Sequence, residues 1–183
     1  MISSAAKEGF DLLLTQALKG SMVPDDCNCD IVTLADDNEI RASKMTVLTV
    51  SSYLFRIIVM FHFTPDAETF AYFTGLNNAS VGEMSEQECI DAIAERGNLC
   101  CGMLNRDLAA YFPHIGMSTP NVIDRHCAAY LQMLNCGHTQ HFALDIERAP
   151  RLHVSLCVSD YADIDFTVSP EAMGSGTGEL ELF

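Results

Sequence analysis

Apolar residues recur at helical spacing in three parts of the chain. Near the start they line one side of a helix and comprise Phe10, Leu13, Leu14, Ala17 and Leu18. This pattern predicts a helix over about residues 5–19, which we expect to end at Gly20, because glycine favours the position after a helix. A short second helix is predicted over residues 64–76, where Pro65 falls in the first turn.

Strand-like segments, rich in β-branched and aromatic residues, occupy much of the remaining chain. We expect strands at about 30–35, 44–50, 54–63, 115–123, 127–134, 140–146 and 152–158. The apolar stretch from Met45 to Phe63 approaches the length of a membrane span, but Arg56 and the Ser51-Ser52 pair interrupt it. Two buried strands joined by a tight connection explain that interruption better than one spanning helix does.

The third helix is the longest and carries the strongest local signal. Ser85 and Glu88 form a capping box, and the periodic pattern that follows runs to about Tyr111. One predicted face is buried and comprises Ile90, Ala94, Gly97, Cys101, Leu104, Leu108 and Tyr111. The opposite, polar face comprises Asp91, Glu95, Asn98, Gly102 and Asn105.

Together these elements indicate an α+β protein, with a mostly antiparallel β-sheet covered by about three helices. A chain of 183 residues is long enough for one domain with a full hydrophobic core. We therefore expect one domain over residues 1–173. The glycine-rich, acidic residues 174–183 are expected to form a flexible tail.

The charge of the chain narrows the classes of partner. Ten Lys and Arg residues oppose twenty-five Asp and Glu residues, which gives a formal net charge of −15 without any basic cluster. Such a chain repels phosphate backbones and anionic lipid, so we expect neither a nucleic-acid nor a membrane partner. The first residues show no signal-peptide pattern and the eight cysteines are scattered, which favours a reducing, cytoplasmic location.

A metal or thiol-redox module is an alternative class, suggested by two groups of residues. Cys27 and Cys29 lie in an Asp-rich segment, while Cys136, His138 and His141 lie close together much later in the chain. Structural zinc sites normally use two ligand pairs at characteristic spacings, and these groups do not match that pattern. We therefore predict no metal site. The sequence also lacks a nucleophile elbow, a phosphate-binding glycine loop and a dinucleotide fingerprint.

The polar face of the long helix is the best candidate site. Each glycine inside a helix costs about 1 kcal/mol relative to alanine. Gly97 lies on the buried face, where it allows close packing, and Gly102 lies on the polar face, where it leaves a notch one turn after Asn98. Glu95 and Asn98 are three residues apart, so their side chains project together and can bind one target. The alternative is an ordinary solvated helix face.

These residues resemble the signature of the CheC/CheX/FliY family of phosphatases, which act on phosphorylated chemotaxis response regulators. The resemblance rests on Glu95-Arg96-Gly97-Asn98 followed by Gly102, and then on Ser118-Thr119-Pro120-Asn121-Val122-Ile123 after the helix. The order of predicted elements is also similar to that of the CheX branch. A single Glu-x-x-Asn motif favours CheX over CheC, in which two copies are usual.

The resemblance implies a role for each matching residue. Glu95 would bind the lysine of a CheY-like receiver domain, and Asn98 would hold the water that attacks the aspartyl phosphate. Asp91, Gly102 and Asn105 share the stripe and are candidates to widen the contact with the partner; ordinary solvation is the alternative role of Asp91 and Asn105. The protein would need no cofactor of its own, since Mg²⁺ would come with the response regulator. The resemblance also implies a homodimer.

Arg96 leaves a second reading open. It stands where an apolar residue is common in the family. The alternative to a phosphatase is therefore a non-catalytic, CheX-like docking protein for a receiver domain.

Overall fold

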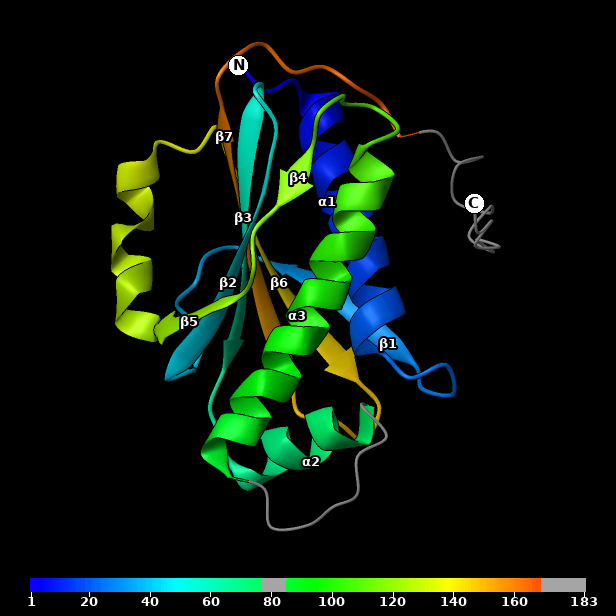
Figure 1. The fold of residues 1–183 in the computed structure, drawn as a ribbon, viewed down its shortest axis with the longest axis vertical. Helices are drawn as coiled ribbons and strands as arrows, with labels where there is room; N and C mark the ends of the chain where they lie inside the picture. The colour runs from blue at the N-terminus through cyan, green and yellow to red at the C-terminus, as the bar shows by residue number, and fades with distance from the viewer. Residues whose placement is uncertain (77–84, 169–183) are drawn as a thin grey trace.

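The computed structural model describes residues 1–76 and 85–168, so the expected tail at 174–183 lies outside the described residues. Figure 1 shows a twisted β-sheet with long helices packed along one face. The helices are α1 (Ser4–Met22), α2 (Ala67–Leu76), α3 (Glu86–Leu108) and the 3₁₀ helix η1 (Arg125–Leu134). The strands are β1 (Cys29–Leu34), β2 (Lys44–Ser51), β3 (Phe55–Phe63), β4 (Gly116–Met117), β5 (Asn121–Asp124), β6 (His138–Ile146) and β7 (Leu152–Asp160).

The sheet runs in the order β1-β6-β7-β3-β2, and the free side of β2 pairs with both β4 and β5. Every pairing between these strands is antiparallel. The expected α+β class with a mostly antiparallel sheet is therefore confirmed.

Strands β2 and β3 form the hairpin that the interrupted apolar stretch predicts. Lys44 lies opposite Phe63 at one end, and Ser51 lies opposite Arg56 at the turn. The amide of Ser52 closes this turn by donating to the carbonyl oxygen of Phe55 at 3.0 Å. Within residues 1–76 and 85–168, no helix combines the length and apolar character that a membrane crossing requires.

Helix α1 is longer than its apolar pattern predicts. It runs to Met22, so Gly20 lies inside the helix and is not its C-cap. The buried side of the helix continues through Ser21, whose hydroxyl donates to the carbonyl oxygen of Ala17 at 2.6 Å, and through Met22. The helix stops just before Pro24, which cannot continue it.

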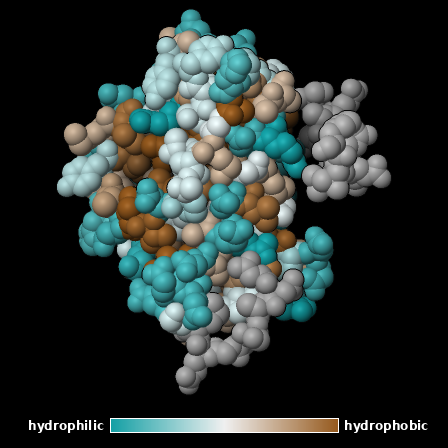
Figure 2. Space-filling view, viewed as in Figure 1, coloured by the Kyte–Doolittle hydropathy of each residue, from teal (hydrophilic) through white to brown (hydrophobic). Residues whose placement is uncertain are grey.

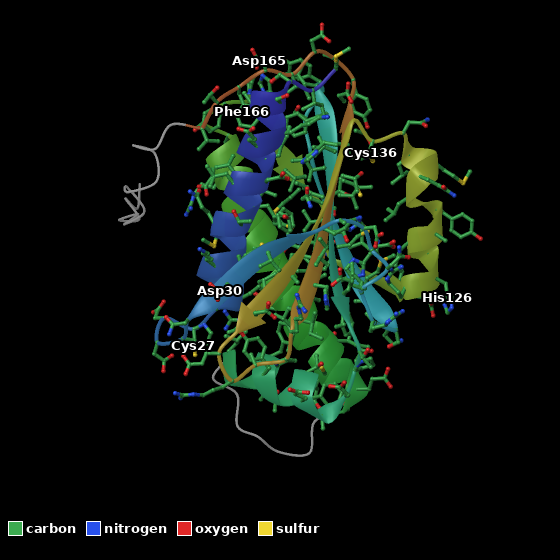
Figure 3. All side chains as sticks on the ribbon, turned by 180° about the vertical axis from the view of Figure 1, so that it is seen from behind. Cys27, Asp30, His126, Cys136, Asp165 and Phe166 are labelled. Atoms are coloured by element: carbon green, nitrogen blue, oxygen red, sulfur yellow. The ribbon has the colours of Figure 1, made fainter. Side chains whose placement is uncertain are left out.

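The predicted strand at 127–134 is wrong, because these residues belong to η1. Asp124 caps this helix by accepting a hydrogen bond from the amide of His126 at 2.8 Å. Ala128 and Leu131, three residues apart, pack against the face of the sheet opposite α1 and α3. Spacing of three fits a 3₁₀ helix rather than a strand. Seen from behind, His126 lies in the first turn of η1, and Cys136 lies in the connection after its end (Figure 3).

The predicted strand at 115–123 is present but broken. Met117 pairs with Val50, whereas Asn121 pairs with Val47, so residues 118–120 stand opposite residues 48–49. This extra residue is a β-bulge, a feature often found beside functional sites. Pro120 has no amide hydrogen and cannot continue the ladder of hydrogen bonds.

A polar cluster lies under η1 on the same outer face of the sheet. The buried hydroxyl of Ser155 lies 2.8 Å from Nε2 of His62 and 2.7 Å from Nδ1 of His141. One hydroxyl can donate to only one ring, so the other ring must donate its N–H to Ser155. An ion pair between Arg125 and Asp37, at 2.8 Å, lies alongside. Burial, followed by the charge of Arg125, lowers the pKa of His62 to about 3.

This cluster predicts an acid-sensitive fold. As pH falls, the unfolded chain protonates His62 near the ordinary pKa of 6.5, whereas the folded chain protonates it only near 3. The stability that neutral His62 contributes is therefore complete above pH 6.5 and is lost as pH falls towards 3. As pH falls through this range, the free energy of unfolding of His62→Gln should decrease less steeply than that of wild type, by up to about 1.4 kcal/mol per pH unit. Urea titrations between about pH 7.5 and about pH 5 would measure this. His114→Gln, at an exposed histidine, is the control; parallel curves for wild type and His62→Gln would contradict the prediction.

Candidate functional site

Helix α3 begins with the capping box that the sequence predicts. Ser85 Oγ accepts from the amide of Glu88 at 3.3 Å, and Glu88 Oε2 accepts from the amide of Ser85 at 2.7 Å. This second bond lowers the pKa of Glu88 below its ordinary value. The reciprocal bonds satisfy two free donors at the helix start and so fix where α3 begins.

The buried face of α3 is wider than predicted and is turned towards α1. It comprises Cys89, Ala92, Ile93, Gly97, Cys100, Cys101, Leu104 and Leu108. Ile90, Ala94 and Tyr111, which we expected on this face, are only half-buried. The difference arises because α3 packs against α1 as well as the sheet: Met103 of α3 meets Gly20 of α1.

The two glycines of α3 have different surroundings. Gly97 is buried, and a Cβ atom placed there would lie 3.1 Å from Leu48 of β2 and 3.2 Å from Phe61 of β3. Gly102 has no heavy atom within 4 Å of the same position. The helix therefore sits closely on the sheet at Gly97 and leaves open space at Gly102.

The polar face of α3 is accessible. Asp91 and Glu95 are exposed, while Asn98, Gly102 and Asn105 are partly exposed. Gln87 donates to Asp91 at 2.8 Å, so Asp91 already has a partner on its own helix. Among the described residues, the side chains of Glu95 and Asn98 make no hydrogen bond or ion pair with one another or with any other group. The space-filling view shows a mixed polar and apolar surface over α3 (Figure 2).

Asn105 has a less exposed carboxamide than its neighbours on the stripe. Its Oδ1 atom is buried, and it has no hydrogen-bond partner among the described residues. An unpaired buried oxygen of this kind costs free energy. The Oδ1 atom of Asn105 is therefore turned inwards, although the residue as a whole is partly exposed, like Asn98 and Gly102.

The segment Ser118-Thr119-Pro120 lies at the level of Gly97 on the neighbouring edge of the sheet. Ser118 and Thr49 are joined by two hydrogen bonds, the Ser118 amide to the Thr49 carbonyl oxygen at 2.9 Å and the Thr49 amide to Ser118 Oγ at 3.0 Å. Leu48, the residue before Thr49, is the one that Gly97 contacts. Helix α3 contacts both β4 and β5, and Figure 1 shows the chain passing beside α3 between these two strands, where the β-bulge lies.

The sequence did not predict the surroundings of two residues at the motif, Leu99 and Arg96. Leu99 follows Asn98 in the helix and exposes 45 % of its surface, so an apolar side chain is also accessible on this part of α3. Arg96 is half-buried and points away from this face; its guanidinium donates to the carbonyl oxygens of Ser21 and Leu76. The helical periodicity could have indicated that Arg96 points away from the polar face, because its position falls between the buried and polar faces.

The residues that suggest a metal or thiol-redox module lie outside α3. A cavity of about 670 Å³ lies between the end of α1, helix α2 and the β6–β7 turn, but neither Glu95 nor Asn98 lines it. In the described ranges, no three His, Cys, Asp or Glu side chains are arranged to hold a metal ion. Burial raises the pKa of both Cys27 and Cys29, which makes these thiols less reactive.

No protein-family model matches the sequence, and no curated protein matches it. Solved structures do resemble the fold. The chemotaxis protein CheX from Vibrio vulnificus superimposes with a TM-score of 0.57 at 14% identity, over 81% of this chain and 95% of that one. The chain has the CheX fold.

Two further structures share this fold. CheX from Borrelia burgdorferi, solved in a complex with CheY, BeF₃ and Mg²⁺, gives a TM-score of 0.57 at 11% identity, over 84% of this chain and 97% of that one. A CheC-like superfamily protein from Shewanella sp. PV-4 gives 0.52 at 15% identity, over 85% and 98% of the two chains. These alignments cover nearly the whole length of each relative.

The contrast between the two glycines of this CheX fold gives a prediction about stability. Gly102→Ala should raise the free energy of unfolding by about 0.5–1 kcal/mol, because alanine favours the helix and meets no neighbour. Gly97→Ala gains the same propensity but forces Leu48 and Phe61 to move, so it should not stabilise the protein. Urea unfolding of both variants would measure the difference. Equal stabilisation by the two substitutions would show that α3 does not sit closely on the sheet.

Proposed function

We propose that this protein is a phosphatase of a phosphorylated response regulator, which hydrolyses the aspartyl phosphate of a CheY-like receiver domain. The observation that carries the proposal is the accessible Glu95–Asn98 pair, without partners among the described residues, on the central helix of a CheX fold. A solvated helix face would account for two polar residues. It would not account for the closely packed Gly97 between them, the open Gly102 after them and the adjoining β-bulge.

The proposed role of Asn98 follows from the chemistry of acyl phosphates. The attacking water forms a bond to phosphorus while the bond to the aspartate oxygen breaks, which yields a carboxylate and inorganic phosphate. The leaving group is already good, so the main requirement is a water held in line with it. A carboxamide can accept a hydrogen bond from that water and remain neutral, whereas a carboxylate would repel the phosphoryl oxygens.

The proposed role of Glu95 is to anchor the partner. Its exposed carboxylate can pair with a lysine of the receiver domain, one helical turn from Asn98. Asp91, Gly102 and Asn105 would extend the contact along the same stripe. Mg²⁺ would be bound by the acidic cluster of the receiver domain, and this protein would supply no cofactor.

The partner class is supported by the relative from Borrelia burgdorferi, whose structure contains CheX together with CheY. The proposal also includes the expected cytoplasmic location and the homodimer that the family resemblance implies. Sedimentation of the purified protein over a range of concentrations would report the dimer.

The decisive experiment follows the decay of a phosphorylated CheY-like receiver domain with and without this protein. Wild type should accelerate the decay. Asn98→Ala should abolish the acceleration at every protein concentration, because the water is no longer held. Glu95→Ala should in addition weaken binding of the receiver domain, by about tenfold or more. Phosphate release and loss of the phosphorylated band measure the same reaction.

Matched controls exist on other elements. Glu8→Ala, at an exposed position of α1, and Asn38→Ala, in the turn before β2, remove the same chemical groups from elements other than α3. Both should leave the decay rate unchanged. If receivers decay at their intrinsic rates with wild type present but one of them still binds, the protein is a docking module and not a phosphatase. If none binds, both readings are wrong.

A further inference from the structure

Arg96 lies inside the Glu95–Asn98 motif but has no access to the face that these residues share. Its side chain extends to the ends of two other helices. Nη1 donates to the carbonyl oxygen of Ser21 at 3.2 Å, and Nη2 donates to that of Leu76. Ser21 lies in the last turn of α1, and Leu76 is the final residue of α2.

These two carbonyl groups are suitable partners for a guanidinium. The last carbonyls of a helix have no partner within that helix, and they carry the negative end of its dipole. A planar guanidinium offers several donors in fixed directions, so it can bond two carbonyls at once. One side chain of α3 is thereby connected to the C-terminal ends of both neighbouring helices.

The contact of α3 with the sheet at Gly97 does little to prevent rotation of the helix, so a connection to other elements is useful there. At Gly97 the helix presents bare backbone to Leu48 and Phe61, which sets how closely it approaches the sheet. A position without a side chain cannot interlock with its neighbours, so it resists rotation of the helix about its axis poorly. Arg96, next to Gly97, supplies a directional contact at the same height.

We infer that Arg96 is a positioning residue: by bonding the ends of α1 and α2, it fixes the rotation of α3 and so the direction in which Asn98 points. This inference rests on the proposed phosphatase function. Asn98 has a short side chain and must place a water accurately, whereas Glu95 has a longer one that can adjust. Loss of Arg96 should therefore impair the chemical step more than receiver binding.

Tyr72 provides a matched control. Its hydroxyl donates to the carbonyl oxygen of Met22, and so connects α2 to the end of α1 without using α3. Tyr72→Phe removes one hydrogen bond between the same two helices that Arg96 joins. It should reduce stability in a similar way but leave the orientation of Asn98 unchanged.

The test measures receiver dephosphorylation as a function of receiver concentration for wild type, Arg96→Met, Arg96→Lys and Tyr72→Phe, with the folded fraction of each determined by circular dichroism. Arg96→Met should lower the saturated rate by about tenfold and change the half-saturating receiver concentration less than about threefold. Arg96→Lys, which keeps a donor, should recover part of the rate. Tyr72→Phe should match wild type per folded molecule.

The outcomes separate the two levels of the proposal. If wild type does not accelerate decay, the phosphatase function fails and this inference fails with it. If wild type is active and Arg96→Met is equally active per folded molecule, only the positioning role is overturned. An increase in the half-saturating concentration at an unchanged saturated rate would also overturn it, since Arg96 would then act on binding. If Arg96→Met does not fold, the intermediate rate expected of Arg96→Lys decides.

Discussion

The close contact between Gly97 and the sheet is the constraint from which the site follows. With only a hydrogen at this position, the backbone of α3 approaches Leu48 and Phe61 more closely than any other residue would allow. That approach buries one side of the helix among the core residues and leaves the opposite side exposed. Because a helix turns by about 100° per residue, the approach of Gly97 to the sheet sets the side of α3 on which Glu95 and Asn98 lie, while the finer rotation of the helix is the part that we assign to Arg96. The cost of a glycine in mid-helix, about 1 kcal/mol, is offset by the packing that it permits.

The rest of the fold supports this one helix from several directions. The hairpin of β2 and β3 provides the surface beneath Gly97, the capping box fixes the start of α3, and α1 packs along the side of α3. Catalytic geometry held by a sheet and helices is more precise than geometry held by loops. Within the described ranges, Glu95 and Asn98 lie on a helix that packs against both α1 and the sheet, yet their side chains have no hydrogen-bond or ion-pair partner. These two side chains are therefore available to another molecule.

Sequence patterns predicted the features that depend on local chemistry. The capping box at Ser85, the polar break between β2 and β3 and the two glycines of α3 all act through nearby residues, so they could be recognised without a fold. The features that depend on distant residues were missed. The helix η1 forms because its residues at spacing three meet an apolar patch of the sheet, and the role of Arg96 depends on where α1 and α2 end. The predicted helix end at Gly20 was wrong for the same reason, since the packing partner of Gly20, Met103, lies on another helix.

The proposed function gives an electrostatic reason for a neutral side chain at the centre of this face. The chain carries a net charge of −15, and a phosphorylated receiver domain adds further negative charge around its phosphate. A carboxylate at the position of Asn98 would face that phosphate directly, and its repulsion would be strong once water is excluded from the interface. The neutral carboxamide of Asn98 and the apolar surface of Leu99 can approach such a group without this penalty. Glu95 is acceptable one turn away only if a cation of the partner faces it. In the proposed complex, this distribution of charge along one helical turn would suit a partner that presents a phosphoryl group and a lysine side by side.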